Sequence, residues 1–187
     1  EALVKAVRRK KIKANIKLLI TDKKNAFVRK RARRLDIEDV FVNPKNFKSR
    51  ILFDKEIIKI LRKEKIKLIA LAGYMRVLSP HFVKSFKNKI LNIHPALLPS
   101  FKGGTAIEDA CNYGCKVTGV TVHFVDEKVD HGPIILQESL KISDTITPKV
   151  LQRKIHKIEH KLYPLVLKMC VEKKIKNKRS TCQNHLE

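Results

Sequence analysis

Long apolar segments are missing from this 187-residue sequence, and glycine is missing before Gly73. No apolar run reaches the ~18–20 residues that a membrane-spanning helix needs. The amino terminus also lacks the short apolar segment of a secretory signal peptide. We therefore expect a cytoplasmic protein without a membrane partner.

Cysteine is sparse, and its spacing fits no common metal site. The four residues are Cys111, Cys115, Cys170 and Cys182, and no second Cys or His pair matches the first two. In a cytosolic chain of this size, free thiols are more common than disulfides. We therefore expect no bound metal.

Acidic residues are outnumbered, with 18 Asp and Glu against 42 Lys and Arg, which gives a formal net charge of +24. Such a charge favours a polyanionic partner, although Lys enrichment also accompanies life at high temperature. The lysines are scattered between aliphatic residues, and neither an RNA-binding aromatic signature nor a Cys/His finger is present. Nucleic acid is therefore not expected as the main partner, whereas the same field would attract a small phosphorylated substrate.

The composition, 43% hydrophobic and 32% charged, is typical of a globular protein. Apolar periodicity predicts alternating strands and helices, hence an α/β fold with a doubly wound, mostly parallel sheet and helices on both faces. We expect one domain over 1–174 and a charged tail over 175–187. The predicted strands are 15–21, 38–43, 66–73, 89–93, 116–125 and 132–142, and the main helices are 1–10, 24–35, 52–65, 104–113 and 147–173.

Polar residues stand at the ends of two predicted strands, where ligand sites of such sheets lie. Asn92 and His94 are two apart in an extended segment, so they face the same side, and Pro95 keeps His94 extended. Asp130 follows the next strand, in a tight turn before Gly132. We also expect a cis peptide bond at Leu98–Pro99 in the loop between them.

These three residue types suit acyl chemistry without a covalent nucleophile. An Asn amide can stabilise an oxyanion, an imidazole can exchange protons near neutral pH, and a carboxylate is expected to raise the pKa of that imidazole. The sequence has no G-x-S-x-G motif to supply a serine. The spacing alone leaves open that Asn92 only caps the turn and that His94 is a hydrogen-bonded core residue.

Four segments, "GYMRVLSPHFV", "LNIHPALLPSFKG", "GVTVHFVDEKVDHGPIILQE" and "IHKIEHKLYPLV", resemble the folate-dependent formyltransferases, and the resemblance extends to about residue 173. Within that family, Pro95 and the "EHKLYP" segment are similar to the members that formylate glycinamide ribonucleotide in purine synthesis. The resemblance implies 10-formyltetrahydrofolate as co-substrate, glycinamide ribonucleotide as acceptor, and a monomer or homodimer.

The same resemblance implies roles for individual residues. Asn92, His94 and Asp130 would be catalytic. His156 and Glu159 would bind the acceptor. The folate-binding residues would be Arg50, Met75, Arg76, Val77, Leu78, Asp126, Glu127 and Val129.

One part of the family pattern has no counterpart in this sequence. Those proteins begin with a strand and a Gly-containing loop that binds the substrate phosphate, whereas this chain begins with "EALVKAV". We therefore expect a truncated start, without the first strand. The alternatives are a formyltetrahydrofolate deformylase, which uses water as acceptor, and a basic nucleic-acid-binding relative without catalysis.

Overall fold

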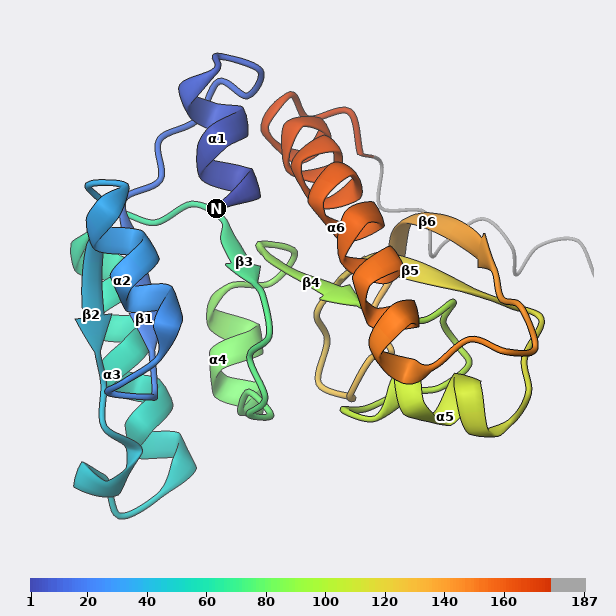
Figure 1. Cartoon of the computed structure of the whole chain (residues 1–187). Helices are drawn as coiled ribbons and strands as arrows, with labels where there is room; N and C mark the ends of the chain where they lie inside the picture. Colours follow the sequence, from blue (N-terminus) through green and yellow to red (C-terminus); the bar gives the residue numbers. More distant parts are fainter. Residues whose placement is uncertain (176–187) are drawn as a thin grey trace, which may run out of the picture.

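The computed structural model describes residues 1–175, and the predicted tail 175–187 lies outside this part except for Ile175. Strands and helices alternate as expected (Figure 1). The helices are α1 Ala2–Arg8, α2 Phe27–Arg34, α3 Arg50–Lys63, α4 Pro80–Ser85, α5 Ala106–Asn112 and α6 Pro148–Val171, with a short 3-10 turn over Pro44–Asn46. The strands are β1 Leu18–Thr21, β2 Glu38–Phe41, β3 Ile69–Leu71, β4 Ile90–His94, β5 Val117–Phe124 and β6 Ile134–Lys141.

Hydroxyl caps define where three of the helices begin. Ser49, Ser79 and Thr147 precede α3, α4 and α6, and each side chain accepts a hydrogen bond from a backbone N–H in the first turn of its helix. In α4 and α6 the next residue is proline, whose fixed φ suits the first helical position. Local sequence therefore fixes the starts of these helices.

The strands form a two-stranded sheet β1–β2 and a four-stranded sheet in the order β3-β4-β5-β6. The α/β class is confirmed, and the strands at 66–73 and 89–93 are neighbours and parallel, as β3 and β4. The parallel ladders are limited to β1–β2 and β3–β4, whereas β4–β5 and β5–β6 are antiparallel. The loop 125–133 is too short for a parallel crossover, which requires a dozen or more residues.

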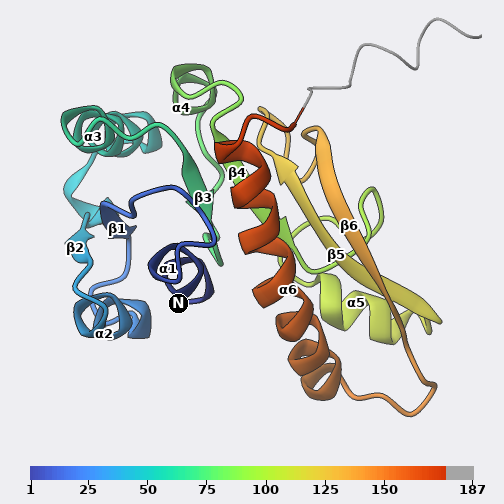
Figure 2. The same cartoon turned by 90° about the horizontal axis from the view of Figure 1, so that it is seen from above.

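Two groups of buried apolar side chains hold the layers together. One lies between α6 and the strands β4 and β5, where Leu151, Ile155 and Val166 are fully buried. The other joins α3 and α4 to β3 and β4 around Phe53 and Phe82. Figure 2 shows α6 running along one face of the four-stranded sheet, with α3 and α4 grouped on the other side of β3. The strand β4 therefore has apolar clusters packed on both sides.

Candidate active site

Asn92, His94 and Asp130 lie together, although the third is far from the other two in sequence. The Asn92 side-chain nitrogen donates to Asp130 Oδ1 at 3.2 Å. His94 Nδ1 lies 3.5 Å from the other carboxylate oxygen, Oδ2. That oxygen also accepts from the backbone N–H of Gly103 at 2.9 Å. Asp130 is thus the centre of the cluster.

The loop 125–133 reaches this position because of two backbone features. Asp130 has φ +46°, in the left-handed region that non-glycine residues seldom occupy. Gly132 lies so close to β5 that a Cβ atom there would stand 1.7 Å from the Phe124 carbonyl oxygen. Asp126 closes the outer part of the loop by accepting from Lys128 N–H at 3.0 Å and by pairing with His131 at 2.8 Å.

His94 is buried, and its two ring nitrogens have different partners. Nε2 lies 2.7 Å from the carbonyl oxygen of Phe101, so Nε2 carries the hydrogen and donates it. In the neutral ring, Nδ1 therefore keeps its lone pair toward Asp130. Burial lowers the pKa of His94, and the attraction of Asp130 offsets this only in part. Asp130 thus raises the pKa of His94, as expected from the sequence, but the net shift is downward because the loss of hydration outweighs the charge pair.

Asp130 has the opposite balance of effects. Burial alone would raise the pKa of Asp130. The contacts with His123 and with the Gly103 N–H lower it, as does the positive charge of His94 or His123 when protonated, and the resulting pKa is about 2. Asp130 is therefore ionised at any physiological pH. It acts as a fixed negative charge and an acceptor for its neighbours.

His123 is a fourth member of the cluster that was not predicted from the sequence. It lies directly opposite Asn92 in the β4–β5 ladder. Its Nδ1 donates to the Phe124 carbonyl at 2.8 Å, which leaves Nε2 of the neutral ring to accept the second Asn92 amide hydrogen at 3.2 Å. Thr121 and His123 share one face of an apolar strand, just as Asn92 and His94 do, and this repeated polar spacing was the available signal.

Except for Arg50, the predicted folate contacts lie on two loops, one after β3 and the other the loop that carries Asp130. Met75 is 72% exposed, and Val77 and Val129 are about half exposed, which is unusual for large apolar side chains. The guanidinium of Arg76 stacks on Phe53, while its buried Nε has no partner among residues 1–175. Arg50 is exposed at the start of α3, and Leu78 is buried.

On the loop that carries Asp130, Glu127 is exposed and 3.7 Å from Lys84, while Asp126 pairs with His131.

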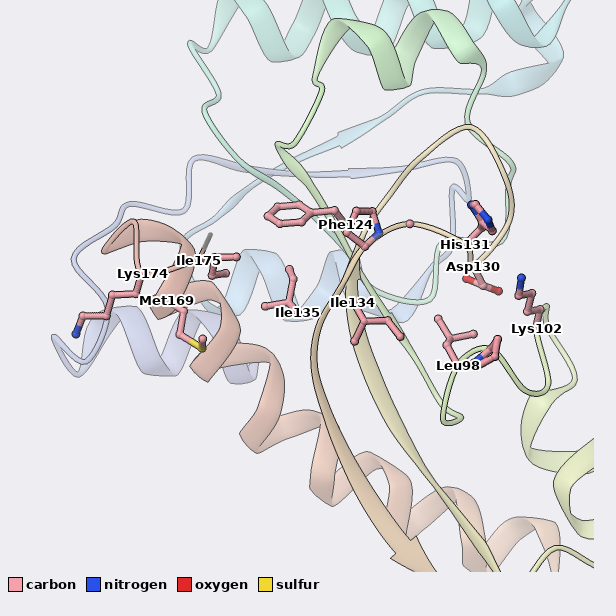
Figure 3. Close-up of a pocket in the computed structure, with 13 residues that line it drawn as sticks. Leu98, Lys102, Phe124, Asp130, His131, Ile134, Ile135, Met169, Lys174 and Ile175 are labelled. Atoms are coloured by element: carbon pink, nitrogen blue, oxygen red, sulfur yellow. The ribbon is translucent and has the colours of Figure 1, made fainter. Parts of the chain in front are cut away.

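A pocket of about 610 Å³ adjoins the carboxylate of Asp130. In Figure 3, Lys102, His131 and Asp130 lie at one end of it, and Met169 lies at the other, on α6. None of the predicted folate-binding residues lines this pocket within the described part of the chain.

His156 and Glu159 lie on α6. Their side chains are 3.9 Å apart, His156 is exposed, and burial raises the pKa of Glu159. Within residues 1–175, no hydrogen bond or ion pair joins either residue to Asn92, His94 or Asp130.

Two further observations concern metals and membranes. Among residues 1–175, no three His, Cys, Asp or Glu side chains are grouped so that they could hold a metal ion. In the same part of the chain, no helix has the length and apolar character that crossing a bilayer requires.

Comparison with known proteins places this geometry in context. The family described as "Formyl transferase" matches residues 1–167. Phosphoribosylglycinamide formyltransferase of Bacillus subtilis is 42% identical over 168 residues, which cover 90% of this chain and 86% of that protein. The human trifunctional purine biosynthetic protein adenosine-3 is 41% identical over 169 residues, and the match spans only 17% of its length.

Solved structures agree with the sequence comparison. Glycinamide ribonucleotide transformylase 1 from Symbiobacterium toebii superposes with a TM-score of 0.90 at 37% identity, covering 92% of this chain and 81% of that one. The Geobacillus kaustophilus enzyme of the same name gives 0.88 at 42% identity, with coverages of 91% and 90%.

Proposed function

This chain belongs to the formyl transferase family, and we propose that it transfers a formyl group from 10-formyltetrahydrofolate to the amine of glycinamide ribonucleotide. The observation that carries the proposal is the cluster in which Asp130 contacts Asn92, His94 and His123 at the end of β4. Relatives of nearly the same length as this chain, named for this reaction, support the choice of acceptor.

Asn92 is the proposed donor to the formyl oxygen. Both of its amide hydrogens are engaged in the free protein, one by Asp130 and one by His123. If the formyl oxygen replaces His123 as acceptor of the second hydrogen, the bond to the Asp130 carboxylate keeps the amide oriented. A preoriented donor of this kind is most valuable when negative charge develops on that oxygen.

His94 is the proposed proton carrier. The lowered pKa of His94 keeps the ring neutral at the start of the reaction, with Nδ1 free to take a proton. As the acceptor amine attacks the formyl carbon, its proton moves to Nδ1, where Asp130 stabilises the imidazolium. The same proton then goes to the departing folate nitrogen. Asp130, with its pKa of about 2, holds charge and geometry and does not itself take the proton.

The folate would lie against the two loops that follow β3 and β5. Exposed apolar side chains at Met75, Val77 and Val129 suit a flat aromatic ring system. The orphaned Nε of Arg76 and the exposed guanidinium of Arg50 suit the polar and acidic groups of a folate. Leu78, Asp126 and Glu127 complete the proposed contacts.

Glu159 and His156 are the proposed acceptor contacts on α6. A partly buried carboxylate with a raised pKa can hold an amine by hydrogen bonding without forming a strong, immobile ion pair. The cytoplasmic location and the monomeric or homodimeric state stay predictions.

The test is an assay of formyl transfer by the purified chain, followed by the absorbance of the folate product. We expect turnover with glycinamide ribonucleotide as acceptor and little turnover with water alone. Equal rates with and without the acceptor would indicate a deformylase. RNA binding without folate-dependent activity would indicate a non-catalytic relative.

A further inference from the structure

A buried hydroxyl connects α6 to the catalytic end of the sheet. Tyr163 is only 5% exposed, and its OH lies 2.7 Å from the carbonyl oxygen of Leu71 and 3.1 Å from that of Leu91. Leu71 is the last residue of β3, and Leu91 immediately precedes Asn92 in β4. The hydroxyl therefore bridges two adjacent strands one residue before the cluster.

The chemistry of this contact is that of a permanent donor. A phenol has one hydrogen, which the two carbonyl oxygens share. Burial raises the pKa of Tyr163 well above its ordinary value, so the donor persists across the whole physiological range. Loss of the hydroxyl would leave two buried carbonyl oxygens without this partner.

Register makes the contact relevant to the reaction. Leu71 pairs with Asn92 in the parallel β3–β4 ladder, so the hydroxyl fixes the part of β4 from which Asn92 projects. On α6, Glu159 lies four residues before Tyr163, and residues four apart lie on the same helix face. The tyrosine thus links the helix face that carries Glu159 to the strand that carries Asn92.

We propose that Tyr163 is a positioning residue, which sets the axial register of α6 against β4 and thereby aligns the amine held by Glu159 with the formyl group at Asn92. This inference rests on the proposed function. It assigns to Tyr163 an effect on the chemical step, through Asn92 and Glu159, and no contact with either substrate.

The test compares Tyr163→Phe with Tyr113→Phe in the full chain. Phe keeps the ring in both, and Tyr113 is a matched control because its side chain is 81% exposed. Misplacing reacting groups by about 1 Å can cost about 10²-fold in rate. We expect Tyr163→Phe to lower kcat by about tenfold to 10²-fold, to leave the folate KM within about twofold of the wild type, and to keep the shape of the pH profile.

Amide hydrogen exchange supplies the second measurement. In Tyr163→Phe, exchange should become faster at residues 69–71 and 90–94, with no change in the β5–β6 ladder, and Tyr113→Phe should match the wild type in both assays. A purely structural role would lower the melting temperature and the amount of folded protein, with kcat per folded molecule unchanged.

Each outcome decides between the two proposals. An active wild type with unaltered kcat in Tyr163→Phe overturns the positioning role and leaves the proposed function standing. A changed pH profile also overturns it, since the hydroxyl would then take part in proton transfer. A wild type without formyl transfer overturns both.

Discussion

The side-chain nitrogen of Asn92 lies 3.2 Å from a carboxylate oxygen of Asp130, although 38 residues separate them in the sequence. The sheet creates this contact, because β4 pairs with β5 and the loop after β5 turns back over the end of β4. The bond restrains the amide, and the carboxylate at its other end also lies beside His94. One fixed negative charge thus contacts two groups for which we propose different chemical tasks.

Replacing His94 by Ala removes the proposed proton carrier. We expect kcat to fall by about 10²–10³-fold, comparable to the loss of one transition-state contact in similar sites. Folate affinity should change little, because the proposed folate contacts lie on the loops after β3 and β5. Steady-state kinetics and a fluorescence titration with a folate analogue measure the two effects, and full activity in His94→Ala would remove His94 from the mechanism.

Asp130 and His94 should act as one unit. Asp130→Ala removes the partner of Asn92 and of the Gly103 N–H and the charge that stabilises the His94 imidazolium. The double variant Asp130→Ala/His94→Ala should therefore lose less activity than the product of the two single losses. The control is the double variant Asn92→Ala/Leu165→Ala, because Leu165 is about half exposed on α6. In this control, the loss of activity in the double variant should equal the product of the two single losses. Multiplicative losses in the Asp130/His94 pair would contradict the coupling.

Much of the fold could be predicted from periodicity and caps. The long helix expected at 147–173 spans Pro148–Val171, because Thr147, Pro148 and the apolar spacing all agree. The cis bond at Leu98–Pro99 is also confirmed. Strand direction was harder to predict, since the segment 95–116 is long enough for a parallel crossover but joins the antiparallel pair β4–β5.

The site was only partly predictable for a different reason. The positions of Asn92, His94 and Asp130 followed from strand ends and from the family resemblance. The protonation of His94 and the part played by His123 depend on burial and on cross-strand register. Neither burial nor cross-strand register can be obtained from the spacing of residues within a single segment.

Acid should destabilise the protein through both ends of the Asp130–His94 pair. The pKa of Asp130 is lowered from 3.8 to about 2. The contribution of its carboxylate to folding stability is therefore fully present above about pH 4 and is lost as the pH falls through 2. This contribution is about 2 kcal/mol at neutral pH. His94 also has a lowered pKa, so stability begins to fall once the pH drops below 6.5, where the unfolded chain takes up the proton first.

Urea unfolding between pH 7 and pH 3 measures this dependence. In Asp130→Asn, the free energy of unfolding should depend less on pH below pH 4. In His94→Gln, it should depend less on pH just below pH 6.5. If the free energy of unfolding of His94→Gln kept the wild-type slope between pH 6.5 and pH 5, the buried neutral state of His94 would be wrong.

Gly132→Ala should disrupt the site more than any other glycine substitution in the loops. The added Cβ would meet the Phe124 carbonyl oxygen at 1.7 Å, so the loop carrying Asp130 must move away from β5. We expect a loss of about 1–3 kcal/mol in stability and at least about 10²-fold in kcat. Gly104→Ala is the control, because nothing lies within 4 Å of the position that its added methyl group would take and its φ is not positive. Equal activity in the two variants would contradict the close approach at Gly132.

Two threonines of β5 provide the sharpest test of how the loop after His94 is held. The Thr121 hydroxyl is fully buried; it donates to the Ala96 carbonyl at 2.7 Å and accepts from Leu98 N–H at 3.0 Å and from the Gln137 amide at 2.9 Å. The hydroxyl of Thr118, three residues earlier, is also buried but has no partner among residues 1–175.

The same substitution should therefore have opposite effects at these two positions. Thr121→Val leaves buried polar groups of the loop unpaired, so we expect a loss of about 1–3 kcal/mol in the free energy of unfolding. It should also lower kcat, because the loop bears Phe101, whose carbonyl orients His94. Thr118→Val removes an unpaired hydroxyl from the interior, so stability should stay the same or rise by about 1 kcal/mol. Urea unfolding and kcat of both variants measure this difference, and a Thr121→Val protein as stable and active as Thr118→Val would show that the Thr121 hydroxyl does not hold the loop.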